Sequence, residues 1–290
     1  MKTKFIVEKI FFGLMIISVI LVFAFLGSIL ITIIRNGWPA MSWDMITQLP
    51  GGGFYIGKEG GVLNAIVGSI YIVGASTILG LLISIPIVFF INIYLKNDSK
   101  LANITRLSFD VLYGIPSIVY GAFGFTIMIF LGLRTSLLGG IIVITLLIIP
   151  IFVRSMDEVA RQLPKHLLEA TFSLGATRYE TIKVAIRQIA PGIATATLLS
   201  IGRAIGDAAG VMFTAGFTDS IPTSLDQPAA TLPLAIFFQL SSPLPEVRER
   251  AYAAALLLTL IVLVLSIVGR MITHRFSKNC LLYTSDAADD

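Results

Sequence analysis

Charged residues are scarce in this sequence. Asp, Glu, Lys and Arg make up 13% of its 290 residues and hydrophobic residues make up 56%, whereas a soluble domain carries about 25% charge. A core of this size cannot hold so much apolar surface, so the excess must face lipid. The net charge of +4 is small and does not indicate a nucleic-acid partner. The composition predicts an all-α integral membrane protein.

Cysteine and histidine are also nearly absent. The single cysteine, Cys280, excludes an internal disulfide bond, and the two histidines, His166 and His274, are too few for a typical zinc site. The sequence contains neither G-x-S-x-G nor H-E-x-x-H, the signatures of a serine hydrolase and a zinc protease. We therefore expect no metal, no cofactor and no enzymatic activity in this chain.

Long charge-free runs are abundant, and they predict about six transmembrane helices. The first run, residues 10–34, is 25 residues long, whereas the apolar core of a signal peptide has only about 7–15 residues. We interpret it as a retained helix. A helical span requires about 20 residues. The other five windows are residues 60–95, 111–133, 135–153, 188–218 and 251–269.

Two windows contain features that modify a simple span. Residues 188–218 are interrupted by Arg203 and Asp207, and we expect one helix over 192–217 with Arg203 near its middle. Residues 227–245 are uncharged but contain four prolines, which break helices. We interpret that stretch as a short half-helix lying against the membrane.

The distribution of Lys and Arg predicts the orientation. Fifteen of these residues fall on the side of the two termini and of loops 96–106 and 154–187, and five fall on the other side. Because positive residues concentrate in cytoplasmic loops, we expect both termini in the cytoplasm. The long loop at 154–190 is then cytoplasmic, and its mixed charge predicts one or two short amphipathic helices.

That loop contains the sequence Glu-Ala-Thr-Phe-Ser-Leu-Gly at residues 169–175. It resembles the EAA loop of ABC-importer permeases, which forms a coupling helix docked on an ATPase subunit. The resemblance assigns ATPase coupling to Glu169, Ala170 and Gly175, and Gly175 permits a sharp turn. The family's I-x-L-P sequence is replaced by Ala-Ile-Arg-Gln at 185–188. An ordinary solvated amphipathic helix remains the alternative.

A second segment, residues 114–124, reads Gly-Ile-Pro-Ser-Ile-Val-Tyr-Gly-Ala-Phe-Gly. It closely resembles a segment of phosphate-transporter permeases. Its glycines allow close helix packing, and Pro116 kinks the predicted span. Ser117 and Tyr120 offer hydroxyls to a neighbouring helix or to a pore. By chemistry alone the segment indicates packing, and the match over eleven residues is what makes it diagnostic of the family. We place Ser117 and Tyr120 among the residues of the expected substrate pathway. The glycines are Gly114, Gly121 and Gly124.

A third segment, Gly-Arg-Ala-Ile-Gly-Asp at residues 202–207, carries charge into the membrane. A buried Arg costs about 2.5–3.5 kcal/mol, so Arg203 requires a partner or a polar cavity. Asp207 lies four residues later, on the same face of a helix. The phosphate permeases carry R-A-I-G-E here, and this chain has Asp in place of Glu. The pair is either an anion relay, because a guanidinium grips an oxyanion well, or a static ion pair.

Shorter matches to the same family at residues 60–68 and 230–233 extend the resemblance over most of the chain. The sequence resembles the PstA-type permeases more closely than the C-type permeases. The resemblance implies the type I permease fold in the bacterial inner membrane. It also implies a phosphate importer that contains a second permease (PstC-like), a cytoplasmic ATPase dimer (PstB-like) and a periplasmic or lipid-anchored phosphate-binding protein (PstS-like). A stand-alone secondary transporter or channel for an anion is the alternative function, and it would need no docking loop.

The expected organisation has three parts. Residues 1–59 form a first helix and an external loop, residues 60–273 form the permease core with its coupling loop at 154–190, and residues 274–290 form a cytoplasmic tail. The last eleven residues, 280–290, resemble the translated end of a sequencing adapter, so we exclude them from the fold. A short disordered acidic tail is the alternative.

Overall fold

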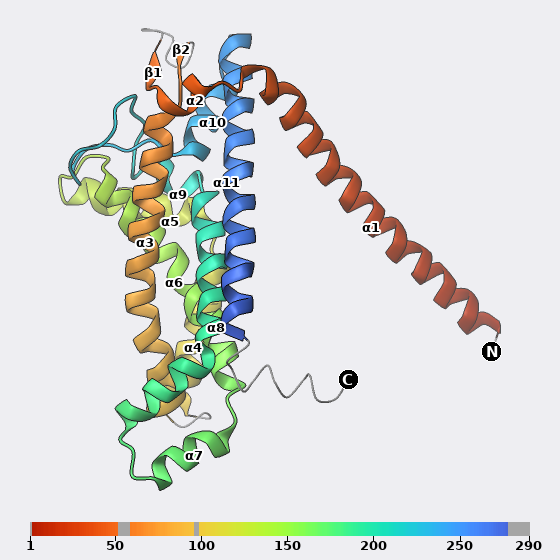
Figure 1. The fold of residues 1–290 in the computed structure, drawn as a ribbon, viewed down its shortest axis with the longest axis vertical. Helices are drawn as coiled ribbons and strands as arrows, with labels where there is room; N and C mark the ends of the chain where they lie inside the picture. Colours follow the sequence, from red (N-terminus) through yellow and green to blue (C-terminus); the bar gives the residue numbers. More distant parts are fainter. Residues whose placement is uncertain (1, 52–58, 96–98, 278–290) are drawn as a thin grey trace.

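The structure is a computed structural model that describes residues 2–51, 59–95 and 99–277 (Figure 1). The expectation for residues 280–290 lies outside this range. The described part of the chain is mostly helical. Its elements are α1 (Lys2–Gly37), η1 (Trp38–Ala40), α2 (Trp43–Thr47), β1 (Pro50–Gly51), β2 (Glu59–Gly60), α3 (Leu63–Phe89), η2 (Phe90–Tyr94), α4 (Lys100–Gly114), α5 (Ser117–Phe130), α6 (Leu137–Arg161), α7 (Lys165–Ser173), α8 (Arg178–Ile205), α9 (Ala209–Met212), α10 (Leu232–Leu240) and α11 (Pro245–Ser277).

The molecule has two distinct ends along its long axis (Figure 1). One end carries α7, and the other carries α2 and the short hairpin of β1 and β2, in which Pro50 pairs with Gly60. We name them the α7 end and the hairpin end. Helix α1 begins and helix α11 finishes toward the α7 end. The two described chain ends therefore lie on the same side, as an even number of membrane crossings requires.

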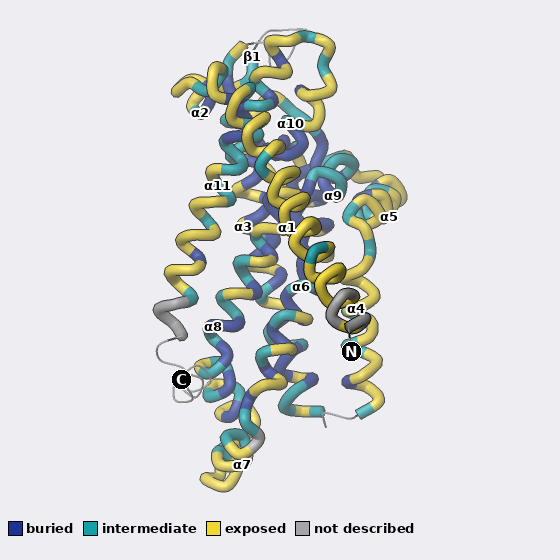
Figure 2. The backbone as a smooth tube through the Cα atoms, turned by 90° about the vertical axis from the view of Figure 1, so that its right-hand side faces the viewer, coloured by how far each residue is buried: buried dark blue, intermediate teal, exposed yellow. Residues whose placement is uncertain are grey.

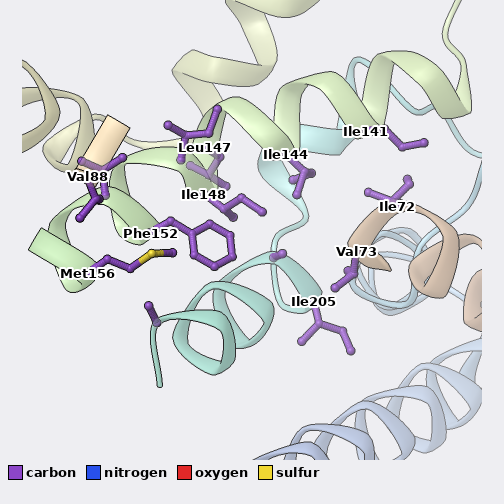
Figure 3. Close-up of a cluster of buried hydrophobic side chains, with 14 of the residues drawn as sticks. Ile72, Val73, Val88, Ile141, Ile144, Leu147, Ile148, Phe152, Met156 and Ile205 are labelled. Atoms are coloured by element: carbon purple, nitrogen blue, oxygen red, sulfur yellow. The ribbon is translucent and has the colours of Figure 1, made fainter. Parts of the chain in front are cut away.

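Helix α6 forms the centre of the bundle. In its most apolar stretch 72% of the residues are buried, compared with 44% in α3 and 33% in α8. Figure 3 shows its side chains Ile144, Ile148 and Phe152 pointing toward α3 and α8. Gly80 of α3 makes room for Phe152, because a Cβ there would lie 2.9 Å from the ring. The main hydrophobic core therefore lies between α3, α6 and α8.

Helix α1 is the opposite case. None of the residues in its most apolar stretch is buried, and it leans away from the bundle, meeting α11 only near its own C-terminal end (Figures 1 and 2). A helix that is apolar on all sides and exposed on all sides requires lipid or a partner protein around it.

The predicted third span, residues 111–133, is not one straight helix. Helix α4 and helix α5 meet at 97° around Ile115 and Pro116. Proline favours an extended conformation in the residue before it and disfavours continuation of a helix, and Ile115 has an extended backbone. We call this bend the elbow. Within the described residues, five helices are long and apolar enough to cross a membrane, and the bent pair makes a sixth if it counts as one span.

The predicted helix over 192–217 is also wrong in its bounds. Helix α8 begins at Arg178 and ends at Ile205, so Arg203 lies in the last turn rather than near the middle. Residues from the expected loop at 154–190 extend both neighbouring helices, since α6 continues to Arg161. The charge-free window misplaced these helices because a helix does not have to end where its apolar stretch ends.

The proline-rich stretch 227–245 contains the expected short helix, α10. Its first residues, including Leu232 and Leu234, are buried, and Ser69 of α3 accepts a hydrogen bond from the Leu232 amide at 2.9 Å. The beginning of α10 is thus inserted into the bundle, where the prediction had it lying against the membrane. The predicted second span gains the π-helical turn η2 at its end.

Candidate functional site

The segment of the EAA-like sequence forms a projection at the α7 end (Figure 1). Helix α7 ends in a tight turn: the Gly175 amide donates to the Phe172 carbonyl at 3.0 Å, and the Ala176 amide donates to the Thr171 carbonyl at 3.1 Å. This pair of bonds is the Schellman motif, which needs a left-handed residue. Gly175 has φ +79°, so the sharp turn expected there is confirmed.

The next helix starts immediately after this turn. Thr177 and Glu180 form a capping box, in which each side chain accepts a hydrogen bond from the other residue's amide, at 3.3 and 2.8 Å. The hydroxyls of Thr171 and Thr181 lie 3.2 Å apart and connect α7 with α8. The projection is therefore a preformed helix-turn-helix unit.

The tip of the projection is exposed and partly apolar. The exposed fraction is 88% for Leu174 and 42% for Phe172, and Glu169 and Ala170 are exposed beside them. Together with Gly175, these residues form what we call the docking tip. Apolar side chains at the end of a preformed projection, next to small and charged residues, are typical of a protein interface.

The predicted charge pair lies where α8 ends and α9 begins. Nη2 of Arg203 lies 3.9 Å from Oδ1 of Asp207, and the Arg203 side chain is 47% exposed while that of Asp207 is 2% exposed. The Asp207 carboxylate is held in place, because its Oδ2 accepts a hydrogen bond from the Gly210 amide at 2.7 Å. The negative end of the α8 dipole favours Arg203 in the last turn.

The side chains of Arg203 and Asp207 differ in burial and in hydrogen bonding. No hydrogen bond within the described residues uses the Arg203 guanidinium, which has five N–H donors. Asp207 is buried and has a backbone partner. The arrangement leaves the cation turned outward with its donors available, while the nearby carboxylate balances its charge.

The glycine-rich segment 114–124 lies beside this charge pair, and two of its glycines pack against neighbouring helices. A Cβ on Gly121 of α5 would lie 2.8 Å from the Ala209 carbonyl oxygen of α9, and one on Gly124 would overlap the side chain of Val143 of α6. The packing role is confirmed for these two glycines. It is wrong for Gly114, which faces open space.

The two predicted pathway hydroxyls are not gathered around Arg203. Tyr120 donates to the Leu112 carbonyl of α4 at 2.9 Å, and its ring lines an apolar cavity of about 480 Å³ beneath the elbow, together with Phe109 and Pro150. Tyr120 thus braces the bend between α4 and α5. Ser117 occupies the first position of α5 and is half-buried.

The sequence did not predict a second polar cluster, near the α7 end. Arg106 of α4 donates from Nε to Oδ2 of Asp157 at 2.9 Å and from Nη2 to Oδ1 at 3.2 Å. Asn92 of η2 donates to the same Oδ1 at 2.7 Å and accepts from Arg106 at 3.2 Å. Arg106 had been counted among the loop cations, and Asp157 falls within the expected loop at 154–190. No local spacing in the sequence indicates this cluster, because its partners lie 51 and 65 positions apart.

Comparison with known proteins places the chain in a protein family. Residues 76–278 match the family described as binding-protein-dependent transport system inner membrane component. The phosphate transport system permease protein PstA of Haemophilus influenzae is 35% identical over 268 residues, which cover 91% of this chain and 93% of that protein. PstA 1 of Mycobacterium tuberculosis is 33% identical and covers 73% of this chain and 70% of that one.

The fold also has a solved counterpart. An inward-facing structure of the MetNI methionine ABC transporter matches with a TM-score of 0.60 at 17% identity, over 74% of this chain and 95% of the matched chain. This similarity concerns the arrangement of helices and confirms the ABC-importer permease fold.

Proposed function

Since the chain belongs to the family of inner membrane components of binding-protein-dependent transport systems, we propose that it is the permease subunit of an ATP-driven phosphate importer. It is a multi-pass inner-membrane protein and a non-catalytic component of an ABC transporter with other subunits. The relatives that carry the name PstA, at 30–35% identity over most of the chain, support phosphate as the substrate.

The other subunits of this importer are a second permease of the PstC type, a dimer of cytoplasmic PstB-like ATPases and a PstS-like phosphate-binding protein. The apolar docking tip around Leu174 and Phe172 supports an ATPase partner at the α7 end, because such an exposed surface needs a cover. The exposed apolar stretch of helix α1 supports an interface with lipid and with the second permease.

The α7 end faces the cytoplasm in this proposal. The distribution of Lys and Arg, fifteen on the side of α7 and five on the other, supports that orientation. It brings Glu169, Ala170 and Gly175 to the side where ATP is present. The docking tip then receives the movement of the ATPases.

Arg203 handles phosphate on its way through the membrane, and Asp207 balances its charge when no anion is bound. The outward-turned guanidinium with available donors supports this role, because an arginine fork matches the geometry of an oxyanion. Tyr120 and Ser117 do not bind phosphate directly in this proposal. Tyr120 shapes the elbow that packs, through Gly121, against the segment following Asp207.

The decisive experiment is transport by the purified complex. The chain would be co-expressed with its three partner proteins, reconstituted into liposomes and supplied with labelled phosphate, with ATP enclosed on the side of the α7 end. We expect ATP-dependent uptake that excess sulfate or molybdate does not compete with. Uptake of sulfate or molybdate instead would refute phosphate as the substrate, and uptake by the chain alone under an ion gradient would establish a secondary transporter.

A further inference from the structure

Helix α4 has little attachment to the rest of the bundle. Among the described residues, α6 is the only element with which it shares an extensive contact, and Ala102 is its only buried residue. At its far end α4 continues into the elbow and α5. On the α4 side, the position of the elbow therefore depends on how α4 is held against α6.

A buried polar clamp holds the two helices together. It consists of Arg106 of α4, Asp157 of α6 and Asn92 of η2, joined by the four hydrogen bonds of 2.7–3.2 Å described above. The side chains of Arg106 and Asp157 are 14% and 11% exposed, so solvent screens their attraction little. A two-pronged Arg–carboxylate contact also fixes the relative orientation of its partners.

A second ion pair joins the same helices with the opposite polarity. Here the cation, Arg154, belongs to α6 and the carboxylate, Asp110, belongs to α4, and their atoms are 3.3 Å apart with both side chains 53% exposed. The two helices are antiparallel (Figure 1). A slip of one turn, about 5.4 Å, would set Arg106 against Arg154 in one direction and Asp110 against Asp157 in the other. Either slip brings like charges together, so the charges fix the register of α4 on α6.

The end of α6 that carries Asp157 is also the end that leads to α7 and the docking tip. Only residues 162–164 separate α6 from α7. The amides of Gln162 and Leu163 still donate to carbonyls of α6, at 3.1 and 3.3 Å, and Leu163 is buried in the core. This connection is short and fixed, so a displacement of α7 has to be passed to α6.

We propose that Arg106, Asp157 and Asn92 make α4 and α6 one moving unit, through which a movement of α7 reaches the elbow and the segment that carries Asp207. The inference rests on the proposed function, in which α7 docks on an ATPase. The three residues act as positioning residues. They touch neither substrate nor ATP, and they determine whether the force from ATP hydrolysis arrives at α5.

A reversible cross-link tests the single unit directly. The exposed pair would be replaced by cysteines, Asp110→Cys with Arg154→Cys, in a Cys280→Ser background, and joined by a short disulfide-containing reagent. If α4 and α6 move together, the cross-linked complex imports phosphate at the same rate as the complex after reduction. A cross-link that stops uptake until it is reduced would overturn the proposal. Asp110→Cys alone, treated with the same reagent, controls for modification.

The ratio of phosphate imported to ATP hydrolysed tests the clamp itself. The change Arg106→Met with Asp157→Leu leaves no unpaired buried charge, so the complex should assemble and hydrolyse ATP while this ratio falls about tenfold, within the usual range of coupling between sites. The charge swap Arg106→Asp with Asp157→Arg should regain it, because the Asn92 amide offers both a donor and an acceptor. Arg154→Gln removes only the exposed pair and should lower the ratio less than the apolar double variant, because an exposed ion pair contributes little.

Two results would contradict the clamp: a wild-type ratio in the apolar double variant, or a folded charge swap that does not regain the ratio. These are distinct from failure of the proposed function. If the chain is not a phosphate importer, the wild-type complex itself imports no phosphate, whereas failure of the clamp is visible only in the variants.

Discussion

Arg203 and Gly175 show how differently single residues are constrained in this protein. Arg203 has an unusual chemical environment, a charge at the end of a membrane helix with a buried counter-ion 3.9 Å away. Gly175 has an unusual backbone, with φ +79° and nothing within 4 Å of where a Cβ would be. Substitutions at the first position therefore test chemistry, and substitutions at the second test conformation alone.

For Arg203, substitutions separate a relay from a static pair. Arg203→Lys keeps the charge but loses the fork of donors, and we expect phosphate uptake to fall about tenfold, the value of one charged hydrogen bond, with an unchanged melting temperature. Arg203→Gln should be worse, since it leaves Asp207 uncompensated. Uptake of labelled phosphate and thermal unfolding of the purified complex are the measurements.

The double change Arg203→Gln with Asp207→Asn provides the control for the pair. A static pair requires that neutralising both partners restores function, because no buried charge then remains unpaired. A relay requires that stability returns while uptake does not. Near-normal uptake by the double variant would end the relay interpretation.

For Gly175, the side chain's ability to adopt a left-handed conformation should decide the outcome. Asn occupies this region readily and a β-branched residue does not. Because the site is open, size is no obstacle. We expect Gly175→Asn to keep binding of the ATPase, and Gly175→Val to cost the turn about 1–2 kcal/mol and to reduce co-purification of the ATPase. Equal co-purification by both variants would show that the turn does not shape the docking surface.

The elbow illustrates how one element depends on another. Pro116 breaks the helix, Tyr120 ties α5 back to Leu112, and Gly121 lets α5 approach the backbone of α9. The bend exists because Pro116 disfavours a continuous helix. Its shape is fixed because Tyr120 holds α5 to α4 and Gly121 allows α5 to pack against α9. A segment that reads as one span thus becomes two helices with separate neighbours.

Two matched alanine substitutions test this packing. Gly121→Ala places a Cβ 2.8 Å from a backbone oxygen of α9, and such overpacking costs about 1–3 kcal/mol. We expect a lower melting temperature and slower uptake. Gly114→Ala adds the same methyl group in open space and should leave both unchanged or raise the melting temperature slightly, because Ala is the better helix former. A stable, active Gly121→Ala variant would contradict a tight contact between α5 and α9.

At the scale of the whole molecule, burial is distributed unevenly. Helix α6 lies inside, α1 lies outside, and α11 is buried toward the hairpin end and exposed toward its other end (Figure 2). Such a fold is incomplete by itself, because only lipid and other subunits can cover α1. The unequal distribution of Lys and Arg between the two ends predicts how the molecule is oriented in the membrane.

That orientation gives a prediction about accessibility. In the Cys280→Ser background, Leu174→Cys at the docking tip should react with a membrane-impermeant maleimide only in inside-out vesicles. Leu225→Cys, in the segment preceding α10, should react only in right-side-out vesicles. Both side chains are well exposed, at 88% and 55%, so accessibility reports the side of the membrane. Labelling of position 174 from outside intact cells would reverse the proposed orientation.

Much of this molecule could be predicted from its sequence because its strongest signals are local. Membrane spans are predicted by about 20 apolar residues in a row. The turn after α7 is predicted by Gly175, which follows Leu174 at the end of the helix. The short length of helix α10 is predicted by the prolines around it. The motif around residues 169–175 predicted a short helix followed by a sharp turn at Gly175, and the family comparison agrees with the function that the motif implied.

The amino-acid sequence by itself determined the number of apolar segments, the positions of the breaking residues and the family. Only the tertiary structure decided where α8 ends, how sharply α4 and α5 bend, and which charges meet. The clamp of Arg106, Asp157 and Asn92 joins residues 51 and 65 positions apart, and no local pattern specifies such a pair. Charges that look like loop residues in a sequence become partners when two helices pack, because desolvation makes each of them require the other.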